Sequence, residues 1–335
     1  MSAGRPLVVW AVSDGRAGIE AQVLGLAEAI ARRRPAETLV KRVAWKGRAG
    51  RRPWWLVPWP MRALDPSSAI APPWPDIWLA AGRATLPLSL RVRRWSRGRT
   101  FVVQTQDPRT PLQPYDLVIP PMHDRLSGEN VLPIVGAPNR LTPERLRADL
   151  VRFEAMIAPL PHPRAAVLIG GKSKAFDLSP ERAAAMARQI EDAVRDAGGS
   201  ILLTFSRRTP DAARAILAAR LRDLPGVIWD GEGENPYFAF LAAADCILAT
   251  EDSTNLATDA AATGKPVFIL KMDGRSEKFR LFHQELERLG VSRPFEGALH
   301  GWTYAPLAET DRAAAEILRR YDLKAGGCVP ARDAA

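Results

Sequence analysis

Four loops in the second half of the sequence carry the residue types that bind a diphosphate. Each loop combines small residues with cations, hydroxyls or carboxylates, and each follows a short apolar run. They contain Gly170, Gly171, Lys172 and Ser173; Ser206, Arg207 and Arg208; Glu234 and Asn235; and Asp252, Ser253, Thr254 and Asn255. Small residues let a phosphate approach the backbone, and Lys and Arg side chains neutralise its charge. Together the four loops predict a diphosphate pocket.

A fifth polar turn follows the first apolar run of the chain. It reads Ser13-Asp14-Gly15-Arg16 and leads into a predicted helix. Because a carboxylate here would repel an anion, Asp14 indicates a general base or a contact to a hydroxyl group rather than a phosphate cradle. The alternative is a turn aspartate that caps the following helix.

These loops need a scaffold that brings strand ends together. Apolar runs of five to eight residues alternate with longer helical patterns in both halves of the chain, and such runs are typical of strands buried on both faces of a parallel sheet. The sequence therefore predicts an α/β protein with two Rossmann-like, doubly wound parallel sheets that face a cleft. Ligands bind outside the carboxyl ends of such strands, where the polar loops fall.

A proline-rich segment separates the two halves. Residues 159–164 read PLPHPR, a composition suited to a linker. We therefore predict a first domain over residues 1–160, a second over 161–322, which ends in a helix near 309–321, and a flexible tail over 323–335.

Composition excludes several classes of protein. The chain has 335 residues, 47% hydrophobic and 25% charged, which is ordinary for a globular protein and excludes a fibrous or disordered one. Its 47 Lys and Arg against 37 Asp and Glu give a charge of +10, which favours an anionic partner. Two cysteines cannot build a disulfide framework or a cysteine-rich metal site. We expect a cytoplasmic protein without a membrane-spanning helix.

Basic residues and tryptophans mix between Lys46 and Arg62. The segment reads KGRAGRRPWWLVPWPMR and includes Arg51, Arg52, Trp54, Trp55 and Trp59. One interpretation is a surface that rests on an anionic bilayer with its rings at the headgroup level. In the other, the tryptophans pack under the first sheet and the arginines are simply exposed. No motif predicts nucleic-acid binding.

One segment resembles a known donor-binding element. Residues 249–270 read ATEDSTNLATDAAATGKPVFIL and resemble that element in GT-B glycosyltransferases: a strand, a Ser/Thr-bearing helix start, a carboxylate, and Gly-x-Pro before the next strand. The resemblance implies that Asp259, five residues before Gly264, binds the donor ribose; the family often has a glutamate at this position.

The whole chain resembles a narrower family. In order, it carries WAVSDGRAGIEAQVLGLAEAI, FVVQTQDPR, DLVIPPMHD, VLIGGKSKAF, TFSRRTP, ENPYFAFLAAAD and EDSTN. From about Val8 to Tyr321 it is similar to the bacterial members of the mitochondrial fission Elm (elongated mitochondria) family, which have a GT-B-like architecture. The plant members are described as adaptors that recruit a dynamin-related protein to mitochondria.

The GT-B resemblance implies a metal-independent reaction without a cofactor. A sugar would pass from a nucleotide-activated donor on the second domain to a cell-envelope or lipid-linked acceptor on the first. Asp14 is the first candidate for the base, and the others are Glu20 and His123. The residues expected to hold the acceptor are Arg16, Gln106, Asp107 and Arg109.

Two other interpretations stay open. In one, the protein is a non-catalytic GT-B-like adaptor at a membrane. In the other, it is a regulator that binds a nucleotide sugar and does not turn it over. As a transferase it would lie in the cytoplasm, peripheral on the inner membrane, with a nucleotide sugar as its partner.

Overall fold

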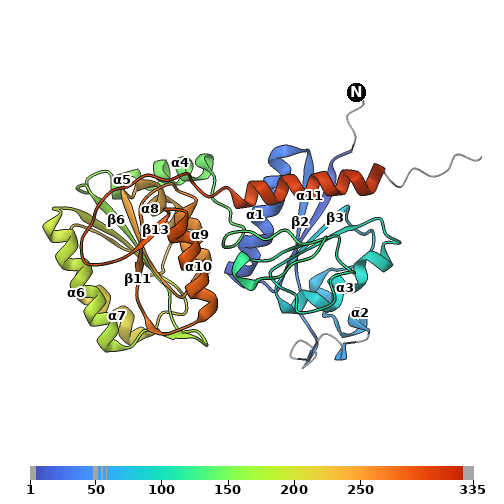
Figure 1. Cartoon of the computed structure of the whole chain (residues 1–335), viewed down its shortest axis with the longest axis horizontal. Helices are drawn as coiled ribbons and strands as arrows, with labels where there is room; N and C mark the ends of the chain where they lie inside the picture. Colours follow the sequence, from blue (N-terminus) through green and yellow to red (C-terminus); the bar gives the residue numbers. More distant parts are fainter. Residues whose placement is uncertain (1–4, 48–51, 54–55, 58, 327–335) are drawn as a thin grey trace, which may run out of the picture. The chain divides into compact units, whose positions relative to one another are not determined.

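The protein contains two compact units, shown in a computed structural model that describes residues 5–47, 52–53, 56–57 and 59–326 (Figure 1). Unit 1 comprises Met1–Arg140 and Ala308–Ala335, and unit 2 comprises Leu141–Leu307. Each unit has its own parallel sheet and its own hydrophobic core. The predicted α/β fold with two parallel sheets is therefore confirmed.

A five-stranded sheet forms the centre of unit 1. Its order is β2-β1-β3-β4-β5 and every neighbouring pair is parallel. The strands are β1 (Leu7–Ser13), β2 (Ala36–Arg42), β3 (Ile77–Ala81), β4 (Phe101–Thr105) and β5 (Leu117–Ile119). β3 and β4 are buried throughout, whereas exposed residues alternate along the edge strand β2. The other edge strand, β5, is buried as well, because the segment with Val131 pairs alongside it at Val118.

Helices cover both faces of the unit 1 sheet. The helical elements are α1 (Ala17–Arg33), α2 (Pro60–Ala63), α3 (Leu86–Trp95), α11 (Glu309–Gly326), and the short 3₁₀ turns η3 (Pro66–Ser68), η4 (Arg83–Thr85) and η5 (Met122–Asp124). α1 and α11 lie side by side and share one core with Val9 and Ala11 of β1 (Figure 1). α3 packs on the opposite face with Trp10 and Val12.

Unit 2 has a six-stranded sheet in the order β13-β11-β10-β6-β8-β9, again all parallel. Its strands are β6 (Arg164–Ile169), β8 (Ser200–Phe205), β9 (Gly226–Ile228), β10 (Cys246–Thr250), β11 (Val267–Leu270) and β13 (Ser292–Pro294). A small antiparallel pair joins β7 (Phe176–Asp177) to β12 (Asp273–Gly274). β10 and β6 are neighbours at the centre of the sheet, so the loops that follow them begin side by side.

Seven helices of unit 2 surround this sheet in the described part of the chain. They are α4 (Pro143–Arg152), α5 (Glu154–Ile157), α6 (Pro180–Asp196), α7 (Asp211–Leu221), α8 (Tyr237–Ala243), α9 (Thr254–Ala261) and α10 (Glu277–Arg288). α6 and α7 bury one apolar cluster on one face, while α5 and α8 bury another around Leu202. Ser179 caps α6 by accepting a hydrogen bond from the Arg182 N–H at 3.2 Å, as the Ser-Pro-Glu start predicts.

The division of the chain differs from the predicted one at both ends of unit 2. Residues 141–160 lie before the predicted boundary but belong to unit 2, because Leu150 and Phe153 pack with Phe240 of α8. The last helix, predicted for the second domain, belongs to unit 1, where Ile317 joins the core under α1. It also continues to Gly326, past the predicted start of the tail at residue 323. An apolar stripe along a helix predicts that this face is buried, but it does not indicate which of the two units the helix packs against.

Candidate functional site

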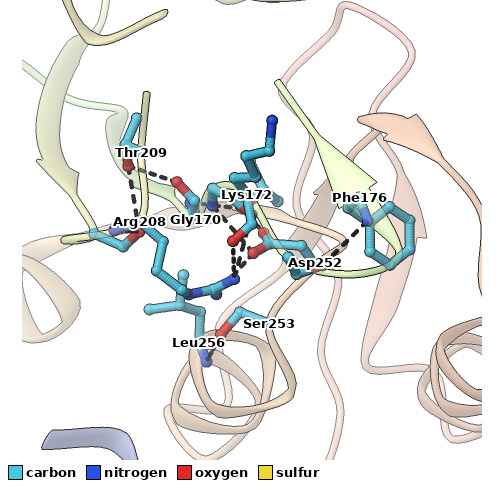
Figure 2. Close-up of polar contacts among 12 residues, drawn as sticks. Gly170, Lys172, Phe176, Arg208, Thr209, Asp252, Ser253 and Leu256 are labelled. Atoms are coloured by element: carbon cyan, nitrogen blue, oxygen red, sulfur yellow. Dashed lines mark hydrogen bonds and ion pairs between the residues drawn. The ribbon is translucent and has the colours of Figure 1, made fainter. Parts of the chain in front are cut away.

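The candidate site of unit 2 is centred on Asp252, at the carboxyl end of β10. Its side chain is fully buried and accepts three hydrogen bonds (Figure 2). The donors are the Thr250 hydroxyl at 2.7 Å, the Gly171 N–H at 3.0 Å and Arg208 Nη2 at 2.8 Å. The carboxylate therefore joins the loops that follow β6, β8 and β10.

The two glycines after β6 are required for this close contact. A Cβ on Gly170 would lie 2.0 Å from Asp252 Oδ1, and a Cβ on Gly171 would lie 2.1 Å from the Arg208 carbonyl oxygen. Both separations are far below van der Waals contact, so any larger residue would push the loops apart. The Gly-Gly pair thus lets two neighbouring loops meet at the strand ends.

The predicted phosphate-binding cations divide into two kinds. Arg208 holds the loops together, since its guanidinium also donates to the carbonyl oxygens of Gly171 and Lys172 at 3.2 and 3.3 Å. The Lys172 ammonium lies 2.8 Å from Asp177, which raises the pKa of Lys172. Arg207 is exposed and has no ion-pair partner among the residues that the structure describes. Of the three predicted cations, Arg207 is the one whose charge is left for a ligand.

Helix α9 begins directly after Asp252. Ser253 is its N-cap, with its hydroxyl accepting from the Leu256 N–H at 3.3 Å, and Thr254 and Asn255 form the first turn. The N-terminus of a helix carries a partial positive charge that favours an anion. The Ser206 hydroxyl, on the loop after β8, accepts from the Arg208 N–H at 3.2 Å and so shapes its own turn; Ser173 does the same for the Phe176 N–H at 3.1 Å.

Asp259 lies on α9 in a less polar place. Its Oδ2 accepts a hydrogen bond from the Tyr237 hydroxyl at 2.9 Å. Burial raises the pKa of Asp259 to about 7, and the hydrogen bond from Tyr237 opposes that rise. Sequence reasoning did not select Tyr237, although it follows Asn235 and Pro236 in the ENPYF motif, where Asn235 caps the turn into α8. Glu234 points instead to the surface, where it pairs with Arg152.

The carboxylates proposed as bases in unit 1 are both paired. Asp14 accepts from Arg16 Nε at 2.8 Å and from the Arg16 N–H at 3.2 Å, which makes a local turn. The N-cap residue of α1 is Arg16, without a side-chain cap hydrogen bond, so Asp14 does not cap the helix. Glu20 receives two bonds from Arg42, at 2.8 and 2.9 Å, which lower its pKa. Ser13 also donates to Glu20 at 3.3 Å. The Arg42 guanidinium therefore stabilises the charged form of Glu20.

The remaining candidates in unit 1 lie in turns. Gln106, at the end of β4, has a left-handed backbone with φ of 66° and donates to Gln22 at 3.1 Å. The Asp107 carboxylate accepts from the Arg109 N–H at 2.8 Å, which makes a local turn. His123 lies in η5 and is partly exposed.

The basic tryptophan segment is described only in part. Arg51, Trp54 and Trp55 lie outside the described residues. Trp59 is 68% exposed and Arg52 is also exposed. Trp59 therefore does not pack under the sheet, in contrast to the buried Trp10 and Trp78.

Within the described ranges, no group of three or more His, Cys, Asp or Glu side chains is arranged to hold a metal ion. Among the helices that the structure describes, none combines the length and apolar character needed to cross a bilayer.

Comparison with known proteins places the chain in a family. The family model described as mitochondrial fission ELM1 matches residues 17–321. The chain belongs to this family. Among its ELM1-family relatives, the mitochondrial fission protein ELM1 of Arabidopsis thaliana is 31% identical over 275 residues. The match covers 73% of this chain and 64% of the plant protein, so the chain spans less than two thirds of that relative.

Solved structures share the fold of this ELM1-family chain at low identity. One is the Methanocaldococcus jannaschii UDP-GlcNAc 2-epimerase in complex with UDP-GlcNAc and UDP, with 11% identity, a TM-score of 0.51, and coverage of 93% of this chain and 99% of that one. Another is the glycotransferase of kitacinnamycin, with 12% identity, a TM-score of 0.51, and coverage of 97% and 94%. At these identities the likeness shows a GT-B-like fold and nothing finer.

Proposed function

We propose that unit 2 binds a nucleoside-diphosphate sugar at the carboxyl ends of its strands, and that the protein transfers the sugar to a cell-envelope or lipid-linked acceptor without a metal ion. The observation that carries the proposal is the joining of three strand-end loops by Asp252 at the start of α9, with the Arg207 cation exposed on one of them. That arrangement is polar, fixed in shape and cationic, as a diphosphate requires. The fold shared with nucleotide-sugar enzymes supports it.

Each residue has a part in the proposed reaction. Gly170 and Gly171 let the loops after β6, β8 and β10 lie close together. Arg207 and the N-terminus of α9 neutralise the charge of the leaving diphosphate. An acceptor hydroxyl attacks the anomeric carbon, the bond from that carbon to the phosphate oxygen breaks, and the hydroxyl proton passes to Asp14. Arg16, Gln106, Asp107 and Arg109 stay the proposed acceptor contacts, and His123 stays an alternative base.

Arg207→Ala is expected to weaken nucleotide binding. We expect UDP and UDP-GlcNAc to bind wild type in isothermal titration and the variant to raise Kd about tenfold, as the loss of one charge-assisted contact implies. Arg222→Ala is the matched control, since Arg222 is an exposed arginine of unit 2 next to Asp223, at the end of α7. Equal Kd values for wild type and Arg207→Ala would contradict the proposed site, and the absence of nucleotide binding in wild type would favour the adaptor.

Product analysis separates transfer from other chemistry on this fold. By NMR, transfer releases UDP only when an acceptor is present, epimerisation yields an isomeric UDP-sugar, and a regulator leaves the donor unchanged. For transfer, Asp14→Asn should lower kcat about 10²- to 10⁴-fold with Kd for the donor unchanged, which is the range for loss of a general base.

Contact with an anionic membrane is the second part of the proposal. The segment before and within α2 exposes Leu56 by 53%, Trp59 by 68% and Met61 by 38%, and the exposed Arg52 and Arg62 flank these residues in the sequence. Exposed rings and aliphatic groups among cations suit a bilayer with acidic headgroups.

Vesicle binding tests this part. The full chain should sediment with vesicles that contain phosphatidylglycerol and not with pure phosphatidylcholine vesicles, and Trp59→Ser should reduce the bound fraction severalfold. Val151→Ser is the control, because Val151 is 70% exposed on α4 of unit 2. Sedimentation unchanged by Trp59→Ser would exclude this surface.

A further inference from the structure

Tyr237 and Asp259 form a hydrogen-bonded pair between α8 and α9, the helix that begins at the proposed donor site. The Tyr237 hydroxyl donates to Asp259 Oδ2 at 2.9 Å, and burial keeps the pKa of Tyr237 well above its usual value, so this hydroxyl remains a donor at every working pH. Asp259 was assigned to the ribose by resemblance alone, and nothing assigns a role to Tyr237. The pair links α8 to α9.

The α8 helix is held at both ends, which fixes the position of Tyr237. At its start, the Tyr237 N–H donates to Asn235 Oδ1 at 3.0 Å. At its end, Lys265 Nζ donates to the carbonyl oxygens of Leu241, at 2.8 Å, and Ala242. A tyrosine on so constrained a helix can hold a carboxylate in one orientation.

Other charged groups near α9 are engaged elsewhere. β10, β11 and α10 pack on α9, and so do α8, through Tyr237, and the segment with Tyr304, whose hydroxyl donates to the carbonyl oxygens of Ala260 and Lys265. After β10 and β11, Glu251 pairs with Lys271 at 3.1 Å; on α10, the buried His283 contacts the Glu251 carbonyl oxygen at 2.9 Å. In the described part of the chain, Tyr237 is thus the titratable group that lies against the Asp259 carboxyl.

We propose that Tyr237 is a positioning residue of the donor site, whose hydroxyl holds the Asp259 carboxylate in place and sets the pH range in which that carboxylate accepts hydrogen bonds from a ribose. The inference rests on the proposed function. An ionised carboxylate accepts from both ribose hydroxyls, whereas a protonated one binds them more weakly. Because burial raises the pKa of Asp259 to about 7, nucleotide affinity should increase as pH rises through neutrality.

The sign of the Tyr237→Phe effect follows from the same contacts. The hydroxyl stabilises the charged carboxylate, so its removal should raise the pKa of Asp259 further. For wild type we expect the Kd of UDP to fall about fivefold between pH 6 and pH 8. For Tyr237→Phe we expect the same fall to be displaced to higher pH, so that the variant binds UDP more weakly than wild type at pH 7 and approaches it at pH 9.

The test is UDP titration from pH 6 to pH 9, together with carbon NMR of the Asp259 carboxyl in the free protein. Tyr115→Phe is the matched control, because it removes a buried tyrosine hydroxyl from unit 1 that contacts Thr110 instead. Asp259→Asn should keep only the rise of affinity that the ionisation of the terminal phosphate of UDP contributes. If wild type binds UDP and Tyr237→Phe keeps the wild-type midpoint in both measurements, the inference fails and the proposed function survives. If wild type binds no UDP, both fail.

Discussion

Asp252→Ala is expected to lower the free energy of unfolding of unit 2 by about 2–4 kcal/mol, because it leaves a buried N–H without its acceptor and opens a void, while the Arg208 side chain is 44% exposed and regains water. The carboxylate is fully buried and is the acceptor for Thr250, Gly171 and Arg208. Alanine would leave a buried N–H and a guanidinium without their acceptor and a void among three loops. Asp252→Asn keeps the volume and part of the hydrogen bonding, so its loss should be smaller.

Urea unfolding of the full chain measures this change. Because two units need not unfold in one step, amide hydrogen exchange of β6, β8 and β10 should assign the loss to unit 2. Asp177→Ala is the matched control: it removes a carboxylate of the same unit whose ion pair with Lys172 is largely exposed, and we expect little change. Equal stability of Asp252→Ala and Asp177→Ala would show that Asp252 does not hold the loops together.

Asp259→Asn is expected to make the ligand-free protein more stable at pH 8. The pKa of Asp259 is about 7 in the folded state against an ordinary value of 3.8. Below pH 3.8 both states hold the proton, so the group has no effect. Between pH 3.8 and pH 7, Asp259 is ionised in the unfolded chain but still protonated in the folded one, so the free energy of unfolding falls as pH rises. Above pH 7 the carboxyl is ionised in both states and the loss is complete. At about 1.4 kcal/mol for each pKa unit, the cost reaches a few kcal/mol.

Asparagine is neutral at every pH and avoids this cost. Urea unfolding should therefore give equal stabilities for wild type and Asp259→Asn near pH 4, with the variant more stable by roughly 2–4 kcal/mol at pH 8. Asp223→Asn, a largely exposed aspartate of the same unit, should follow wild type. A variant that is less stable than wild type at pH 8 would mean that the ionised carboxylate stabilises the fold. A higher free energy of unfolding for Asp259→Asn would mean that the aspartate lowers the stability of the wild-type protein. A residue that costs stability in this way is typical of a binding site.

Sequence patterns predicted most of the strands and helices and the sheet edge at which the polar residues lie, but not α10 or β13. Short apolar runs predicted parallel strands because a strand that is buried on both faces is apolar at every position and does not alternate between polar and apolar residues. The Gly170-Gly171 and Asp252-Ser253 turns were predicted at strand ends because each lies close after such an apolar run. The family resemblance was also carried by contiguous motifs, which a linear sequence preserves.

Only the tertiary structure decided which partner each side chain has. Arg207 and Arg208 are adjacent and identical in type, yet Arg208 binds the buried Asp252, while Arg207 has no ion-pair partner among the described residues. Tyr237 and Asp259 meet although α8 and α9 are separated by a strand, and α11 packs on α1 from the far end of the chain. Residue type fixes the charge and hydrogen-bonding capacity of a side chain, whereas its partners, burial and pKa depend on atoms that are distant in sequence.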